Sequence, residues 1–187
     1  MGKEIINNIK EEIRKRCESP NNFFGSSSYN HIESVAKNAV ELANIYNADA
    51  EVCEIAGWLH DIAAITDYSL YEKHHIHGAN IAEEILKSYN YPKGKIELVK
   101  LCILNHRGSI IKEKTNKEEK CVSDAISHYN NLPELFYLAF VKRNLNPKEG
   151  IGFVKNKLDR SYNKMSKESK EYYKEKRDSI ILILNGY

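Results

Sequence analysis

Histidine and aspartate side chains recur along this chain in segments that are otherwise apolar. His60 and Asp61 are adjacent and follow an apolar run that ends at Leu59. Burying such a polar pair is costly unless its groups are bonded to something. Imidazole and carboxylate together suit zinc, iron, manganese, cobalt or nickel. The pair therefore predicts a metal site, with Asp61 as a candidate to bridge two cations, which a single imidazole cannot do.

The other residues of this kind lie near the ends of predicted helices or within apolar runs. They are His31, His74, His75, His77, His106 and Asp124, whereas His128 falls outside these groups and is predicted to lie on the surface. The four cysteines are far apart and form no C-x-x-C pair, which disfavours a structural zinc site because such sites are rich in thiolates. We therefore expect divalent cations, with iron, manganese, cobalt or nickel favoured and magnesium as an alternative.

The elements that position these residues are predicted to be helices. Apolar residues recur with helical spacing, and all four prolines fall between the apolar runs. Asp49 is predicted to cap a central helix that ends near His60, and Thr115 and Glu118 have the spacing of a capping box. We expect helices over about 5–17, 31–46, 50–59, 77–89, 96–104, 115–126 and 166–184. The pattern predicts an all-α protein, folded as a compact helical bundle.

Composition agrees with one globular domain over residues 1–187. The chain has 42% hydrophobic and 29% charged residues and a formal net charge of +2, a balance typical of folded proteins. Residues 142–187 carry an excess of six positive charges, which we interpret as a solvated helix, with attraction of an anion as the alternative. The N-terminus lacks an apolar signal core and no apolar run approaches the about 20 residues that span a bilayer, so we expect a cytoplasmic protein with no membrane partner.

The order of these residues resembles the HD-domain superfamily of metal-dependent phosphohydrolases. The segments ADAEVCEIAGWLHDIAAI and HHIHGANIAEEIL match its usual motif surroundings, and the resemblance covers about residues 29–130, which leaves 131–187 as a C-terminal helical extension. It implies the HD helical bundle and two metal ions per chain. The implied ligands are His31, His60, Asp61 and Asp124, as in mononuclear members, together with His74 and His106, which match the added histidines of dinuclear members.

The activity that the resemblance implies is hydrolysis of a nucleotide or a related phosphate ester or anhydride by metal-activated water. Asp61, His75 and His77 are the candidate catalytic residues, although His75 and His77 are also alternative ligands, and Arg107, Lys73 and Lys93 are candidate phosphate contacts. Two departures from the family pattern stand out. Ile62-Ala63-Ala64 replaces the common Ile-Gly-Lys, and the Gly-Tyr-Pro of the cyclic-di-GMP phosphodiesterases is absent after His106.

Two other functions fit the same residues. One is a non-catalytic module that binds metal or nucleotide in signalling, although such modules usually lack some of the ligands. The other is a di-iron oxygenase on the HD fold, which oxygen consumption by iron-loaded protein would distinguish. The expected partner is a small phosphorylated molecule, most simply a nucleotide. Tyrosines and lysines interleave near the C-terminus, but we expect them to cover the bundle rather than bind nucleic acid, and the oligomeric state stays open.

Overall fold

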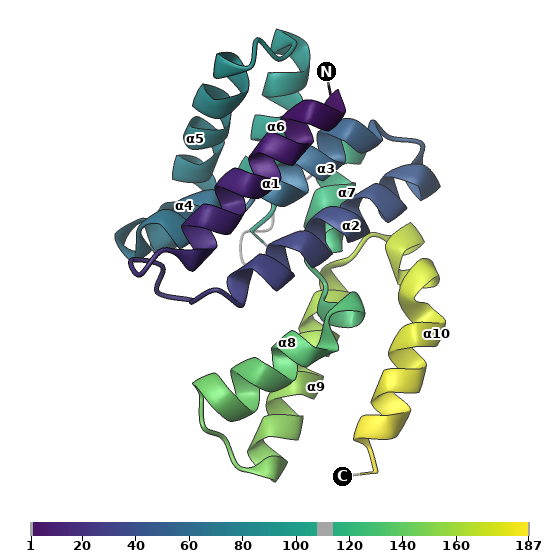
Figure 1. Ribbon diagram of the computed structural model, residues 1–187. Helices are drawn as coiled ribbons and strands as arrows, with labels where there is room; N and C mark the ends of the chain where they lie inside the picture. Colours follow the sequence, from purple (N-terminus) through teal and green to yellow (C-terminus); the bar gives the residue numbers. More distant parts are fainter. Residues whose placement is uncertain (1, 108–113, 187) are drawn as a thin grey trace. The chain divides into compact units, whose positions relative to one another are not determined.

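The computed structural model describes residues 2–107 and 114–186, and the described residues form helices and connecting turns with no strand. The predicted all-α class is therefore confirmed. The chain divides into two compact units, Met1–Ala125 and Ile126–Tyr187 (Figure 1). No helix within the described ranges is long and apolar enough to cross a membrane.

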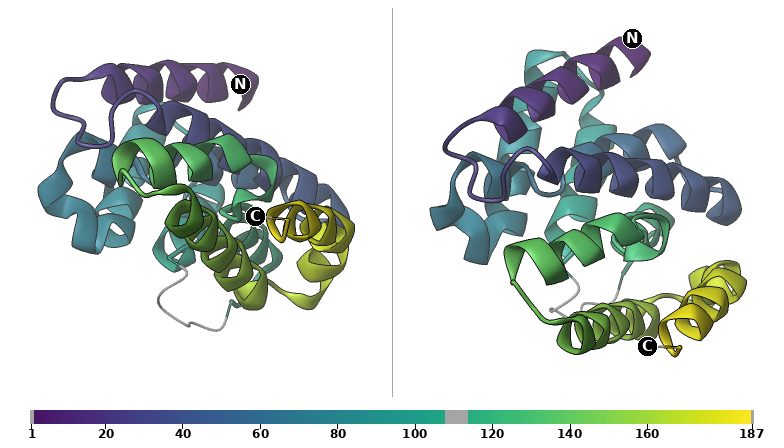
Figure 2. Two further views of the ribbon diagram at one scale, coloured as in Figure 1. Left: turned by 90° about the horizontal axis from the view of Figure 1, so that it is seen from below. Right: turned by 60° about the horizontal axis from the view of Figure 1, so that its bottom comes forward.

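The first unit contains the longer series of helices. Its elements are α1 (Gly2–Glu18), α2 (Ser28–Tyr46), α3 (Ala50–Leu59), α4 (Ile62–Thr66), the 3-10 helix η1 (Tyr68–Lys73), α5 (His74–Ser88), α6 (Lys93–Asn105) and α7 (Lys117–Ala125). Helix α3 packs against α1, α2, α6 and α7, while α5 packs against α4 and α6 (Figures 1 and 2). Helix α3 is thus the centre of this unit, and the residues that follow it lie among several helices.

The sequence explains why α3 occupies the centre. Seven of its ten residues are buried, including Trp58, which is 2% exposed. The predicted cap at its start is present, because the Asp49 carboxylate accepts hydrogen bonds from the backbone N–H groups of Glu51 and Val52. A helix that is apolar nearly all round removes the most apolar surface from water when other helices cover every face, and this burial stabilises the fold.

Two predicted helix starts differ from the structure. Helix α5 begins at His74 rather than near His77, because the preceding six residues form η1 and lead directly into it. Helix α7 begins at Lys117, and its first turn is capped by Asn116, whose side-chain oxygen accepts from the Glu119 N–H at 2.8 Å. The predicted box of Thr115 and Glu118 is wrong because an amide side chain one residue later makes the bond.

The second unit contains the 3-10 helix η2 (His128–Asn130), α8 (Leu132–Phe136), the π-helical turn η3 (Tyr137–Lys142), α9 (Pro147–Lys164) and α10 (Lys167–Leu184). Tyr129 is its central side chain: it stacks on Tyr173 of α10 with ring centroids 5.6 Å apart, and its hydroxyl donates to the Leu158 carbonyl of α9 at 2.9 Å. His128 is 9% exposed and lies 3.4 Å from the Glu134 carboxylate. The prediction that His128 lies on the surface is therefore wrong.

The start of α3 is tied to α6 by a cluster whose stability depends on pH. Lys95 Nζ lies 3.0 Å from Asp49 Oδ2 and 3.1 Å from Glu51 Oε1. Burial opposes ionisation of Asp49, but its hydrogen bonds to Lys95 and to backbone N–H groups outweigh burial and lower its pKa. The pKa of Glu51 is lowered chiefly by the hydrogen bond from the Tyr91 hydroxyl and to a lesser degree by Lys95. A carboxyl group whose pKa is lower in the folded than in the unfolded protein stabilises the fold. This contribution is complete above the unfolded pKa of about 4 and is lost as the pH falls below that value through the folded-state pKa.

We accordingly expect Lys95→Met to lower the thermal midpoint by about 2 °C at pH 7, since partly exposed ion pairs contribute little. The difference from the unchanged protein should shrink as the pH falls below about 4, where both carboxyl groups become protonated. Thermal unfolding followed by circular dichroism at pH 7 and pH 3 measures this. An equal difference at the two pH values would show that the lysine acts through packing.

Candidate metal centre

His60 and Asp61 occupy the turn between α3 and α4. Helix α3 ends at Leu59 and α4 begins at Ile62, so the two polar residues fall at the junction. The Asp61 carbonyl accepts from the Ile65 N–H at 3.1 Å and so starts the next helix. The His60 side chain is 1% exposed, whereas that of Asp61 is 27% exposed. The turn therefore presents a partly accessible carboxylate above a buried imidazole.

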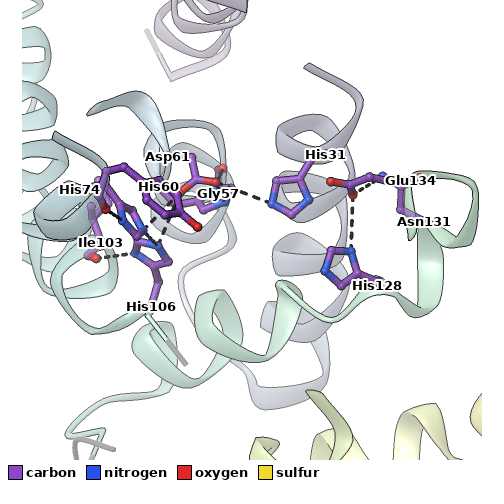
Figure 3. A network of polar contacts seen from close by, with 11 residues as sticks. His31, Gly57, His60, Asp61, His74, Ile103, His106, His128, Asn131 and Glu134 are labelled. Carbon is purple, nitrogen blue, oxygen red and sulfur yellow. Dashed lines mark hydrogen bonds and ion pairs between the residues drawn. The ribbon is translucent and has the colours of Figure 1, made fainter. Parts of the chain in front are cut away.

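The two carboxylate oxygens of Asp61 face two different pairs of histidines. Oδ2 lies 3.3 Å from His60 Nε2 and 3.8 Å from His31 Nε2. Oδ1 lies 3.5 Å from His74 Nε2 and 3.8 Å from His106 Nε2. Figure 3 shows His60, His74 and His106 gathered around Asp61, with His31 approaching from α2. Four segments, at α2, at the turn after α3, at the start of α5 and at the end of α6, thus meet at one aspartate.

Backbone carbonyl groups fix the orientation of three of these rings. The Nδ1 atoms of His60, His74 and His106 lie 2.8, 2.6 and 2.6 Å from carbonyl oxygens three residues earlier in the chain. A carbonyl only accepts hydrogen bonds, so each Nδ1 carries the hydrogen. In the neutral ring Nε2 then has a lone pair, and all three lone pairs are directed at the Asp61 side. Histidines that bind a metal through one ring nitrogen typically donate a hydrogen bond from the other nitrogen to a carbonyl group, as these three do.

The resulting set of atoms fits a cation. His74 Nε2 and His106 Nε2 lie only 3.1 Å apart, although each presents a lone pair to the other. His60 Nε2 is buried and has no hydrogen-bond partner within the described part of the chain. Acceptor atoms at such distances repel one another unless positive charge lies among them. Two groups of three potential ligand atoms, from His31, His60 and Asp61 and from Asp61, His74 and His106, each lie within 4.8 Å of one another.

The protonation states favour metal binding as well. Burial raises the pKa of the Asp61 carboxyl. The neighbouring histidines, His60 most and His106 and His31 less, outweigh the effect of burial and hold this pKa well below its usual range. Burial, together with the neighbouring His60, lowers the pKa of His106 to about 3. At neutral pH the carboxyl is therefore ionised and this imidazole is neutral, which are the forms that bind divalent metals.

Other residues predicted for the site lie in the same unit but outside these two groups. Asp124 is 3% exposed on α7, which packs against α2 and α3. His75 is buried and His77 half-buried in the first turn of α5, beside His74. Lys73 is exposed at the end of η1. The roles of these four residues stay predictions.

The structure separates one predicted phosphate contact from the site and places another beside it. Lys93 is the first residue of α6, whereas His106 directly follows the last. At 1.5 Å per residue the two ends are about 20 Å apart, so the structure does not bring Lys93 together with His106, and its role as a phosphate contact stays a prediction. Arg107, next to His106, donates to the Glu72 carbonyl of η1 and lies 3.6 Å from the Glu72 carboxylate.

A buried glutamate that the sequence pattern did not indicate supports the end of α6. Glu119 of α7 is 0% exposed and accepts hydrogen bonds from Asn105 Nδ2 and from the Thr115 hydroxyl at 2.7 Å. Asn105 immediately precedes His106, so the glutamate fixes the backbone on which this imidazole stands. Its sequence signal is weak, because an acidic residue in the first turn of a helix usually faces water and the helix dipole.

We expect Glu119→Ala to destabilise the fold by about 1–3 kcal/mol, because it leaves the Asn105 amide and the Thr115 hydroxyl without their partner. The thermal midpoint should fall by roughly 2–4 °C for each kcal/mol. Glu119→Gln keeps the size and one acceptor and should lose less than Glu119→Ala. A midpoint for Glu119→Gln equal to that of the unchanged protein would mean that the side chain contributes packing alone.

Comparison with known proteins agrees with this geometry. The family model of the HD domain matches residues 28–126, which is more than half of the 187 residues. The chain belongs to the HD-domain family. The predicted resemblance is thereby confirmed. HD domains bind divalent metals and are generally found in hydrolases, and the His and Asp groups of this HD-domain protein are suited to hold such ions.

Solved structures share the fold of this HD-domain protein at low sequence identity. Bacillus subtilis YpgQ aligns with a TM-score of 0.73 at 16% identity, over 99% of this chain and 94% of that chain. YpgQ in complex with ADP aligns with a TM-score of 0.69 at 18% identity, over 97% and 94%. A predicted HD superfamily hydrolase from an uncultured Thermotogales bacterium gives 0.55 at 21% identity, over 84% of each chain. No curated protein matches the sequence significantly.

Proposed function

We propose that this protein is a metal-dependent phosphohydrolase that cleaves a nucleotide or a related phosphate ester or anhydride. The observation that carries the proposal is the division of the Asp61 carboxylate between two histidine pairs, with Oδ2 toward His31 and His60 and Oδ1 toward His74 and His106. A bridging carboxylate between two imidazole pairs suits two divalent ions. The crystal structure of YpgQ with ADP supports a nucleotide as the substrate class.

The residues of this chain have distinct tasks in the proposed reaction. When bound, two divalent ions would supply an activated water molecule and neutralise charge on the transferred phosphoryl group. His31, His60, His74 and His106 would hold the ions with Asp61, and the buried Asp124 would complete the set. Backbone carbonyl groups keep the rings of His60, His74 and His106 in one tautomer and orientation, so no reorganisation is needed as charge develops.

Groups around the centre are proposed to handle the substrate. Arg107 is the nearest candidate to clamp a phosphate, because a guanidinium group binds phosphate through two parallel hydrogen bonds; it would exchange its bond to Glu72 for the substrate. Lys73 is exposed one residue before His74 and would add positive charge. His75 and His77 are the candidates to donate a proton to a leaving oxygen, which an alkoxide needs and a phosphate does not.

The direct test is to measure metal content and phosphate release on the same preparations. Protein purified without added metal is loaded in turn with manganese, iron, cobalt, nickel or magnesium, and its ions per chain are counted by elemental analysis. Phosphate release is then followed for nucleoside mono-, di- and triphosphates. We expect two ions per chain and turnover with at least one metal. Failure to bind metal under every condition would contradict the proposal, and oxygen consumption by the iron form without phosphate release would favour an oxygenase.

A single substitution distinguishes two ions from one. We expect His74→Ala to lower the metal content from two ions to one per chain, because only the group on the Oδ1 side of Asp61 loses a ligand. The ion on the Oδ2 side, at His31 and His60, should be retained. His77→Ala, three residues along the same helix, is the matched control and should keep both ions. Loss of every ion in His74→Ala would indicate that the site binds metal only as a whole.

A further inference from the structure

Three exposed aromatic rings form a stacked surface next to the proposed metal centre. Phe23 and Tyr68 stack with centroids 4.1 Å apart, and Tyr68 and Tyr71 lie 5.5 Å apart with planes at 15°. Tyr71 in turn stacks on His74, at 5.5 Å and 18°. The exposed fractions of Phe23, Tyr68 and Tyr71 are 63%, 46% and 39%. Their rings thus run from solvent to a proposed metal ligand, and we call Phe23, Tyr68 and Tyr71 the aromatic surface.

The backbone beneath this surface is fixed by hydrogen bonds. Phe23 lies in the loop before α2, where the buried Asn22 side chain donates to the carbonyl groups of Cys17 and Gly25 at 3.0 Å and accepts from the Phe24 N–H at 3.1 Å. Gly25 has a φ of 76°, a conformation that glycine adopts without strain. The loop is therefore built to hold its rings in place, although the rings themselves face water.

The other half of the aromatic surface is equally supported. Tyr68 and Tyr71 belong to η1, whose start is capped by Asp67, which accepts from the Ser69 N–H at 2.8 Å. The half-buried Phe24 lies under the surface, with its centroid 5.8 Å from Tyr68 and 5.5 Å from Tyr71. Exposed aromatic rings that are held in a fixed arrangement over a half-buried ring mark a binding surface, because solvent alone gives no reason to keep them there.

The charges beside the aromatic surface indicate what it binds. Arg107 crosses to η1 and donates to the carbonyl of Glu72, the residue after Tyr71. On this side of the unit a guanidinium group and the candidate metal ligands therefore adjoin one end of the stack, while the other end is apolar and exposed. A ligand that fits both ends has phosphates at one end and a flat ring at the other. The stack between these ends comprises three ring spacings, 4.1 Å from Phe23 to Tyr68 and 5.5 Å each from Tyr68 to Tyr71 and from Tyr71 to His74.

We propose that the aromatic surface binds the base of a nucleotide whose phosphates lie at the metal centre. This inference rests on the proposed function and narrows it to substrates that carry an aromatic base. Stacking tolerates any base, because every base has a π face, and typically contributes the equivalent of about five- to hundredfold in affinity for each base. The protein would then select nucleotides over base-free polyphosphates without selecting strongly among bases.

The test compares ADP with pyrophosphate, which has the same number of phosphates and no base. Affinities for metal-loaded full-length protein are measured by isothermal titration calorimetry. We expect Tyr68→Ala to weaken ADP binding at least fivefold, with a much smaller change for pyrophosphate, and Tyr68→Phe, which keeps the ring, to restore the preference for ADP. Phe23→Ala, at the most exposed ring, is the second variant should Tyr68→Ala fail to fold. The matched control is Tyr172→Ala in α10, where the tyrosine is 47% exposed.

Each outcome decides between the two proposals. A ratio of ADP to pyrophosphate affinity that is unchanged in Tyr68→Ala and Phe23→Ala overturns the base site, whether or not the protein hydrolyses nucleotides. A ratio that falls in both variants, in a protein that never releases phosphate, supports the base site and overturns the hydrolase. An unchanged ratio with a shift in oligomeric state, measured by light scattering, would assign the aromatic surface to an interface between copies of the chain.

Discussion

We expect Asp61→Asn to abolish both metal binding and phosphate release. The asparagine has the same shape but lacks the charge, and its amide group can offer an oxygen to only one of the two histidine pairs. Loss of a group that merely supports a ligand typically costs about 10–100-fold in metal affinity, so loss of the shared ligand should cost more. Elemental analysis of the purified variant and a phosphate-release assay measure the two effects on one preparation.

The loss of metal in Asp61→Asn must be distinguished from a loss of folding. Asp61→Asn keeps the size of the side chain and leaves the carbonyl groups that hold the rings of His60, His74 and His106 in place, so the variant should keep its helices while it loses the attraction for cations. Asp178→Asn, which removes an aspartate paired with Arg177 on α10, is the control for a lost negative charge. An Asp61→Asn protein that is folded and retains two ions per chain would contradict the central role given to this residue.

Asp61 could be identified from the sequence, because a polar pair at the end of an apolar helix is costly to bury unless it binds something. Helix spacing alone does not separate His74, His75 and His77, because all three lie within one turn of a helix start and a shift of the predicted boundary exchanges them. The resemblance to the HD-domain family is what selected His74. The structure places His74 against Asp61 at 3.5 Å, since η1 ends at Lys73 and α5 starts with His74. A boundary error of three residues is enough to misplace a ligand, so spacing alone does not fix a ligand set.

Other features depend on contacts between distant parts of the chain. The separation of Lys93 from His106 could have been predicted from the sequence, because the expected helix over about 96–104 already lies between them. In contrast, no local pattern predicts that Phe23 stacks on Tyr68, 45 residues later, or that Glu119 holds Asn105. Such pairs arise from tertiary packing, which overrides local preference, and they appear only once the helices are assembled.

The second large effect on stability and metal binding is expected from a substitution at Gly57. At this glycine of α3 the backbone of α2 lies directly against the position that a side chain would fill. A Cβ atom at Gly57 would lie 2.6 Å from Ala36 Cα and 3.1 Å from Ala36 N. Backbone atoms cannot swing away as a flexible side chain does, so the two helices must separate. Overpacking of this kind costs about 1–3 kcal/mol, against which an alanine in place of a helical glycine returns up to about 1 kcal/mol.

The separation should also disturb the metal centre, because the two helices carry its ligands. His31 lies on α2, whereas His60 follows α3 and its Nδ1 is held by the Gly57 carbonyl itself at 2.8 Å. We therefore expect Gly57→Ala to lower the thermal midpoint by roughly 5 °C and to weaken the ion on the Oδ2 side of Asp61 more than the ion on the Oδ1 side. Thermal unfolding and metal titration measure the two effects.

Gly94→Ala provides the matched control for Gly57→Ala. Gly94 lies in the first turn of α6, and a Cβ atom there meets nothing within 4 Å, so the alanine should leave the midpoint unchanged or raise it and leave metal affinity unaltered. If Gly57→Ala behaves like Gly94→Ala, α2 and α3 can separate more easily than the 2.6 Å between a Cβ atom at Gly57 and Ala36 Cα implies. If it lowers the midpoint but leaves both ions equally tight, the positions of His31 and His60 are set by contacts other than this pair of helices.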